Sequence, residues 1–286
     1  MPNLLDIRRR IKSTKNTQQI TKAMKLVSAS KLRRASEAAT GARPYAERIF
    51  DVHSSVLKNL NEWDGPLYRK SEGKTLVVVI AADKGLCGSF NANIFKHVTR
   101  MIDSEGQDNL KFMTLGRKAV AYFNHLGTST EAEYSDIFRN VDFTLAETIS
   151  NQILELFLGG EVSRVVLVYN KFINVLLQEV NEKQLLPLSA DDAAAEAPAG
   201  DGIEHLAEPG LAPILEELAP EVVKIQLFQA LLESAAAEHA ARMTAMDAAT
   251  SNAKDLIDQL TLDMNKARQA AITTELIEVV SGAAAL

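Results

Sequence analysis

The chain has 286 residues, of which 47% are apolar and 24% charged, and its formal net charge is -6. This composition is typical of a globular protein and excludes a disordered chain, a collagen-like fibre and a disulfide scaffold. The longest apolar run, Leu76 to Ala82, is far shorter than the roughly 20 residues of a membrane-spanning helix, so we expect no transmembrane segment. We also expect no signal or transit peptide, and the single cysteine, Cys87, suits a reducing compartment.

The charges are unevenly distributed along the chain. Residues 1–60 hold 13 Lys and Arg against 4 Asp and Glu, whereas residues 61–220 hold 13 against 24. A basic segment on an acidic protein is typical of contact with nucleic acid, anionic lipid or an acidic protein surface. The alternative, a solvated helix face, is about as frequent.

The first part of the sequence predicts a long helix. Residues 3–40 contain no Gly or Pro and are rich in good helix formers. Apolar residues recur at spacings of three and four, so we expect them to form one buried stripe: Leu4, Ile7, Ile11, Ile20, Met24 and Val27. We predict that the helix continues to about Leu60, with Pro44 as the candidate position for a kink.

The middle of the chain alternates between two patterns. Apolar runs that are rich in β-branched residues at 76–82 and 165–169, and a shorter run at 112–115, predict buried strands. Amphipathic helical stretches lie between them, starting near Phe90 and Ala146. Alternating strands and helices predict a mostly parallel sheet with right-handed crossovers, and residues 174–188 read as a further extended segment.

The last part predicts a second long helix. Residues 189–213 are rich in Ala, Pro, Gly and acids, which indicates a loop or insertion. Residues 221–281 contain no Gly or Pro, and a heptad count from Ile225 predicts an apolar seam that includes Met246, Ala249, Ala253, Leu256, Leu260 and Asp263. We therefore expect an antiparallel coiled coil between the terminal helices, and four segments: an N-terminal helix (1–60), an α/β domain (61–188), the insertion (189–213) and a C-terminal helix (214–286).

No catalytic or metal-binding constellation stands out. The turn Asp83-Lys84-Gly85-Leu86-Cys87-Gly88-Ser89 follows a predicted strand, but it matches neither phosphate-binding glycine motif, and a tight turn explains it without a ligand. The five histidines share no metal-ligand spacing with one another or with Cys87. The basic helix has no aromatic residue before Tyr45, so stacking on nucleic acid bases is not expected. We expect no cofactor and no metal.

Several strings resemble a known family. Residues 20–32 (ITKAMKLVSASKL) closely resemble the N-terminal helix of the gamma subunit of bacterial, proton-transporting F-type ATP synthase. The resemblance continues in DKGLCG (83–88), GRK (116–118) and YNK (169–171), and it is strongest in EHAARMTAM (238–246) and NKARQAAIT (265–273). These motifs cover nearly the whole chain except the acidic insertion.

The resemblance implies a non-catalytic rotor. In this family the two terminal helices form an antiparallel coiled coil inside a ring of three alpha and three beta subunits. A Rossmann-like middle domain contacts the epsilon subunit and the c-subunit ring. The resemblance therefore implies a peripheral protein at the cytoplasmic face of the bacterial plasma membrane, with no nucleic acid partner. A nucleotide-binding α/β protein with a coiled-coil oligomerisation stalk is the alternative, and a nucleic-acid-binding coiled coil is a further one.

The resemblance also implies partner-binding residues. The basic N-terminal helix would face acidic loops of the beta subunits, and an uncharged C-terminal end, residues 279–286, would sit in an apolar bearing. Lys25 departs from the family pattern, since many relatives carry an acid there. The residues implied to contact the beta subunits are Lys22, Met24, Lys25, Arg268, Gln269, Thr273 and Glu275.

Overall fold

The computed structural model describes residues 4–60, 65–189 and 210–284, and these fall into two compact units. One unit takes its residues from the two ends of the chain, up to Ser28 and from Arg242 onward. The other spans Ala29–Ala241. The predicted insertion at 189–213 lies almost wholly outside the described residues.

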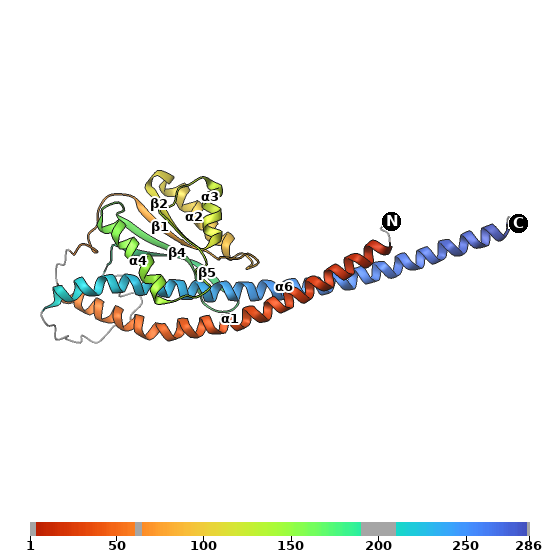
Figure 1. The fold of residues 1–286 in the computed structure, drawn as a ribbon, viewed down its shortest axis with the longest axis horizontal. Helices are drawn as coiled ribbons and strands as arrows, with labels where there is room; N and C mark the ends of the chain where they lie inside the picture. Colours follow the sequence, from red (N-terminus) through yellow and green to blue (C-terminus); the bar gives the residue numbers. More distant parts are fainter. Residues whose placement is uncertain (1–3, 61–64, 190–209, 285–286) are drawn as a thin grey trace. The chain divides into compact units, whose positions relative to one another are not determined.

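The unit from Ala29 to Ala241 is built on a five-stranded sheet with strand order β3-β2-β1-β4-β5. Four of these strands, β2, β1, β4 and β5, are labelled in Figure 1. The first four strands run parallel, and β5 pairs antiparallel with β4. The strands are β1 (Thr75–Ile80), β2 (Leu110–Leu115), β3 (Ala132–Tyr134), β4 (Arg164–Phe172) and β5 (Gln178–Leu186). The predicted mostly parallel sheet is confirmed, whereas β3, three residues long and not fully buried, was not predicted.

Both faces of this sheet are covered, which explains why its central strands are continuously apolar. Val77 and Val79 pack in one core cluster against α2 (Phe90–Glu105) and α3 (Arg117–Leu126). Leu76 and Val78 pack in a second cluster with α4 (Phe143–Leu158) and with residues 46–50 and 219–231 of the two long helices. A short 3-10 helix (Gln107–Asn109) connects α2 to β2. All six residues of β1 are buried, five of them completely.

The two long helices are α1 (Leu4–Asn59) and α6 (Leu211–Ala284). Helix α1 runs through Gly41 and Pro44 without a break, and Pro44 is exposed. Helix α6 begins three residues earlier than the predicted C-terminal helix and contains Pro220. None of the described helices has the length and apolar character needed to cross a membrane.

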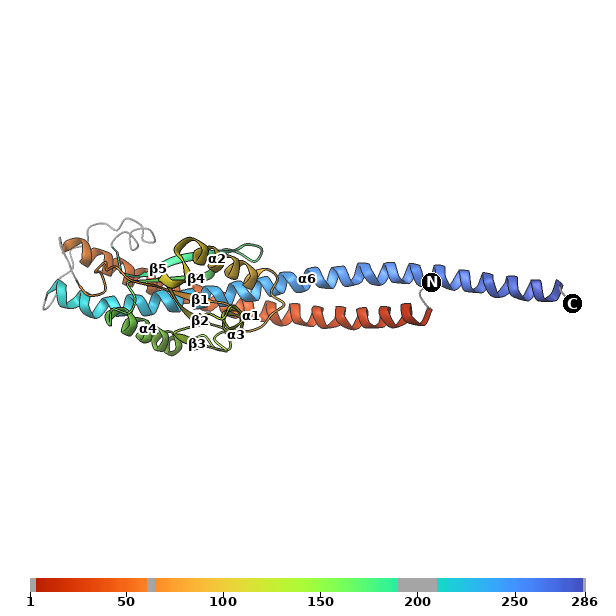
Figure 2. The same cartoon turned by 90° about the horizontal axis from the view of Figure 1, so that it is seen from above.

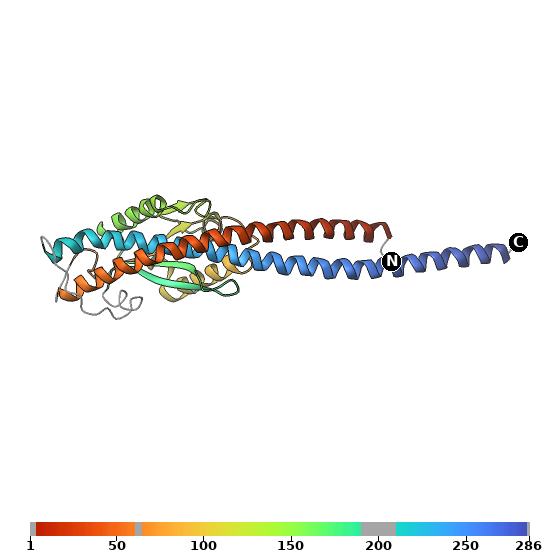
Figure 3. The same cartoon turned by 90° about the horizontal axis from the view of Figure 1, so that it is seen from below.

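The unit formed by the chain ends is an antiparallel pair of helices. Thr21 contacts Thr250, and four residues further along α1 Lys25 contacts Asp247, so the two helices run in opposite directions. Within this unit α6 continues past the start of α1 toward the C-terminus (Figures 2 and 3). The predicted α/β fold with antiparallel terminal helices is confirmed.

The buried stripe of α1 differs from the prediction. Ile7 is buried as expected, but the side chains of Ile20 and Val27 are 60% and 57% exposed, while Thr21 and Ser28 are buried. The observed stripe advances in steps of four and three from Ile7 to Ser28. Ile20 and Val27 each precede a stripe position by one residue, which turns them about 100° away from the partner helix.

The seam of α6 is also shifted at alternate positions. Met246, Ala253 and Leu260 are buried as predicted, but Ile257 is 9% exposed whereas the predicted Leu256 is 41% exposed. The heptad count began in a stretch where nearly every residue is buried, because residues 230–240 pack on all sides in the other unit. That stretch has no single buried stripe, so counting heptads from it cannot predict which residues of the following stretch face α1.

Candidate partner-binding surface

Hydrogen bonds within the chain cross the carboxyl edge of the sheet, the edge at which an open α/β sheet usually binds a ligand. Such sites lie beyond the carboxyl ends of the strands where strand order reverses, here between β1 and β4. Asp83, just after β1, accepts hydrogen bonds from the backbone N–H groups of Arg117 (3.1 Å), Asp136 (2.8 Å) and Phe138 (3.2 Å). Its carboxylate therefore joins three loops of the same chain.

Two amides complete this internal bonding. The backbone N–H of Ala82 donates to Asn91 Oδ1 at 2.9 Å, and the buried Asn170 Nδ2 donates to the Phe90 carbonyl at 3.2 Å. These bonds tie the start of α2 to the turn after β1 and to β4. The sequence interpretation of residues 83–89 as a tight turn agrees with this geometry.

The turns after β1 and β2 are in direct contact. A Cβ atom on Gly116 would lie 2.0 Å from the carbonyl oxygen of Ala81, and Gly116 has φ +100°. The neighbouring Lys118 N–H donates to the Ala82 carbonyl at 3.1 Å. Only a glycine allows this approach, so backbone packs against backbone at the carboxyl edge of the sheet.

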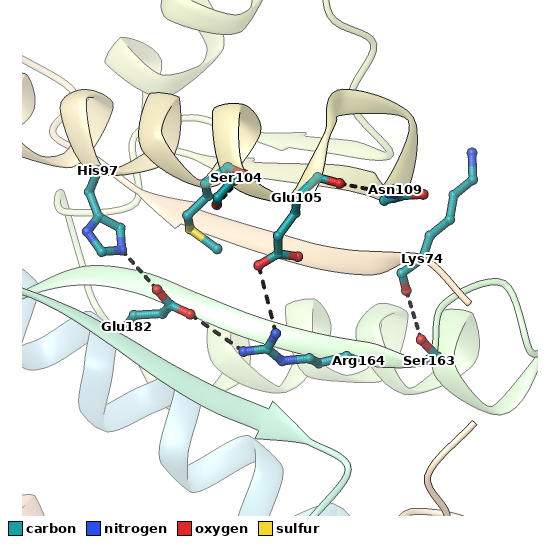
Figure 4. A network of polar contacts seen from close by, with 9 residues as sticks. Lys74, His97, Ser104, Glu105, Asn109, Ser163, Arg164 and Glu182 are labelled. Carbon is teal, nitrogen blue, oxygen red and sulfur yellow. Dashed lines mark hydrogen bonds and ion pairs between the residues drawn. The ribbon is translucent and has the colours of Figure 1, made fainter. Parts of the chain in front are cut away.

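Polar side chains elsewhere in this unit have structural partners. In Figure 4, Glu182 of β5 lies 3.0 Å from His97 of α2 and 3.5 Å from Arg164 of β4, and Arg164 also approaches Glu105. This network ties the start of β4 and the middle of β5 to α2. Among residues 4–60, 65–189 and 210–284, no group of three or more His, Cys, Asp and Glu side chains is placed to hold a metal ion.

The sheet unit also has a polar pocket of about 340 Å³. Cations and carboxylates both line it, among them Arg43, Lys171 and Lys183 together with Glu47 and Glu233. The ammonium of Lys183 lies 5.6 Å from the centre of the Phe50 ring. Because opposite charges share its walls, the pocket offers no clear selectivity for an anion or a cation.

The outer surface of the helix pair combines positive charge with apolar side chains. The exposed cations of α1 include Arg8, Arg9, Lys12, Lys15 and Lys22. Leu5, Ile20, Leu26 and Val27 are between 57% and 68% exposed on the same helix. A solvated helix face would be polar, so this surface has the composition of an interface.

The first group of predicted site residues lies where the two helices face each other. Met24 and Lys25 are half-buried and Lys22 is exposed. Lys25 Nζ donates to Asp247 Oδ1 at 2.6 Å. Sequence reasoning missed Asp247 and Thr250, because no local pattern relates residues more than two hundred positions apart.

The second group lies on the far stretch of α6. Arg268, Gln269, Thr273 and Glu275 are exposed, and so is every residue from 268 to 283 whose burial is described. This stretch also exposes five large apolar side chains, with exposed fractions between 49% and 70%: Ile272, Leu276, Ile277, Val279 and Val280. The structure therefore does not bring the two groups together: one flanks the contact with α1, and the other lies on the exposed stretch of α6 that begins near the start of α1.

Comparisons with known proteins agree with one another. The family model described as ATP synthase matches residues 3–286. The ATP synthase gamma chain of Heliobacterium modesticaldum is 45% identical over 291 aligned positions, covering 100% of each chain. That of Geotalea uraniireducens is 43% identical, covering 99% of this chain and 98% of the relative.

Solved structures resemble this chain as well. The central stalk and c-ring structure of the Tetrahymena thermophila mitochondrial ATP synthase contains a chain that is 28% identical, with a TM-score of 0.62; the match covers 80% of this chain and 99% of that one. A chain of the Euglena gracilis mitochondrial ATP synthase, at 19% identity and a TM-score of 0.68 over 99% of this chain and 94% of that one, shares the fold. The chain therefore belongs to the ATP synthase gamma chain family.

Proposed function

We propose that this chain is the central rotor shaft of an F-type ATP synthase and carries no catalytic residue. It would couple proton-driven rotation of the c-subunit ring to ATP synthesis and hydrolysis at the sites of the alpha/beta ring. The observation that carries the proposal is the stretch 268–283, a helix that is exposed at every position whose burial is described and is rich in large apolar side chains. A surface of this kind needs an enclosing partner, and a ring around the helix supplies one.

The mechanism follows from differential contact. Three chemically identical beta subunits can hold different nucleotide affinities only if an asymmetric body touches each of them differently. Two helices of unequal reach form such a body, since within their unit α6 extends beyond α1 (Figure 2). Turning it takes each site through the same sequence of states, and by thermodynamic reciprocity hydrolysis at the sites turns it back.

The partner contacts are assigned as follows. Acidic loops of the beta subunits would meet the surface around Lys22 and Met24, beside which Lys25 is paired with Asp247. A pair of unit charges about 4 Å apart near a surface interacts by roughly 4 kcal/mol before desolvation and screening, enough to bias an orientation without fixing it. The polar side chains of the exposed stretch would contact the beta subunits further along α6: Arg268, Gln269, Thr273 and Glu275.

The remaining assignments follow from the same role. The α/β unit would contact the epsilon subunit and the c-subunit ring, and the complex would hold the chain at the cytoplasmic face of the bacterial plasma membrane. The bacterial gamma chains that it resembles over their full length support this location. Side chains at the carboxyl edge of the sheet bond within the chain, Asp83 with three backbone N–H groups and Asn170 with the Phe90 carbonyl, and this supports a domain that binds no nucleotide.

Reconstitution tests the proposal. The purified chain is mixed with alpha and beta subunits from the same source, and the stoichiometry and MgATP hydrolysis of the product are measured. We expect one copy of the chain to join three alpha and three beta subunits, with hydrolysis that no component shows alone. A chain that stays alone would contradict the proposal, and a chain that binds or hydrolyses nucleotide unaided would favour the nucleotide-binding alternative.

A further inference from the structure

The pairing of α1 with α6 becomes polar along one stretch. At its start α1 turns Leu4, Ile7 and Ile11 toward the partner helix. From there to the end of this unit, the buried and half-buried positions are mostly polar: Thr14, Gln18, Thr21, Lys25 and Ser28. Ile20, Leu26 and Val27 of this stretch are exposed instead, and Met24 is half-buried. On the α1 side the pairing is therefore mostly polar here, and it faces the buried apolar residues Met246, Ala253 and Ile257 of α6.

Two direct contacts cross between the helices in this stretch. The hydroxyl oxygens of Thr21 and Thr250 are 2.8 Å apart. One helical turn further on, the ammonium of Lys25 donates to the carboxylate of Asp247 at 2.6 Å. The side chain of Lys25 is 38% exposed and that of Asp247 60% exposed, so the pair is accessible to solvent but short.

Polar partners at the seam of a helix pair specify register, because a slip by one position leaves them unpaired. A slip at this point would separate Lys25 from Asp247 and bring both threonines against other groups. We propose that Lys25 and Asp247 lock the register of α1 against α6 next to Met24, and that Lys25 acts in coupling as a positioning residue through Asp247 and not by direct contact with a partner loop. Only the coupling part of this inference rests on the proposed function.

Lys22 provides a matched control within the same turn of α1. It carries the same charge and is exposed. Within the described residues, no carboxylate lies within ion-pair distance of its ammonium. Replacing Lys22 by Glu makes the same change of charge as replacing Lys25, without breaking a contact between the helices.

The lock is tested first on the isolated full-length chain by amide hydrogen exchange of residues 14–28. Lys25→Glu places two like charges together, and we expect exchange there to become about two- to five-fold faster, the range for an exposed ion pair that controls local opening. Adding Asp247→Lys to Lys25→Glu restores the slow exchange. Lys25→Arg, which keeps the positive charge, and Lys22→Glu, which leaves the pair intact, both exchange as slowly as the wild-type chain. Unchanged exchange in Lys25→Glu, or no recovery in the double variant, overturns the lock.

The coupling part is tested in the assembled enzyme as protons pumped per ATP hydrolysed. We expect this ratio to fall in Lys25→Glu and to recover when Asp247→Lys is added. A fall that Asp247→Lys does not reverse means that Lys25 meets a partner directly, and no fall means that the lock does not serve coupling. If neither the wild-type chain nor any variant assembles, the proposed function is refuted. The hydrogen-exchange experiment on the isolated chain would still test whether Lys25 and Asp247 fix the register of the two helices.

Discussion

Gly116 determines how the turn after β2 meets the end of β1. Its φ of +100° is strained for any other residue, and a Cβ there would lie 2.0 Å from a backbone carbonyl oxygen. We predict that Gly116→Ala lowers the free energy of unfolding by about 3 kcal/mol or more. Gly127 is the control, because it also has positive φ but has open space around it, and its replacement by Ala should cost only about 1 kcal/mol. Equal losses in urea unfolding would contradict the close approach.

His53 makes the stability of the sheet unit depend on pH. Its side chain is buried on α1, its Nε2 lies 2.7 Å from the Tyr68 hydroxyl, and burial lowers the pKa of His53 from 6.5 to about 4. The unfolded chain therefore binds a proton at a higher pH than the folded chain does. The stability that comes from a neutral His53 is fully present above pH 6.5 and is lost as the pH falls toward 4.

The size of this effect can be measured with one variant. A shift of this size corresponds to roughly 3 kcal/mol at most between the two ends of that range. We expect the free energy of unfolding of the wild-type chain to decline more steeply between pH 6.5 and 4 than that of His53→Gln. Parallel declines would contradict the lowered pKa, because they would mean that His53 takes up its proton at the same pH in the folded and the unfolded chain.

At the scale of elements, the corrected seam of α6 makes a direct prediction. Ile257 faces α1 and is 9% exposed, whereas the neighbouring Leu256 is 41% exposed. We predict that Ile257→Ala destabilises the helix pair by about 2 kcal/mol and that Leu256→Ala costs less than about 0.5 kcal/mol. Amide exchange of residues 242–267 reports both changes in the same chain. The opposite ranking would restore the heptad phase counted from Ile225.

Helices and central strands could be predicted because their residues obey simple patterns. The apolar run 76–82 and the absence of Gly and Pro in 221–281 each point to a single structure. Strand β3 has no such pattern, since it is three residues long and none of its residues is buried. The seam of α1 was missed because buried Thr21 and Ser28 look like surface residues in the sequence, while the exposed Ile20 and Val27 look like core.

At the scale of the whole molecule, sequence motifs led to the family, and physical patterns alone did not. Composition and periodicity predicted an α/β unit with paired helices, an architecture that many functions share. The predicted contact residues came from resemblance, and the structure adds that Lys25 already has a partner in Asp247. That pair joins residues from opposite ends of the chain, so it could be found only once the helices were placed side by side.

The central claim, that this chain turns within a ring of other subunits, is tested most directly by watching it move. A probe is attached through Lys96→Cys on α2, an exposed position, while the native Cys87 is buried. The assembly with alpha and beta subunits is immobilised, and the probe is followed during MgATP hydrolysis. The account predicts rotation in one direction that stops when nucleotide is removed. A probe that stays at a fixed angle while the assembly hydrolyses MgATP would contradict it.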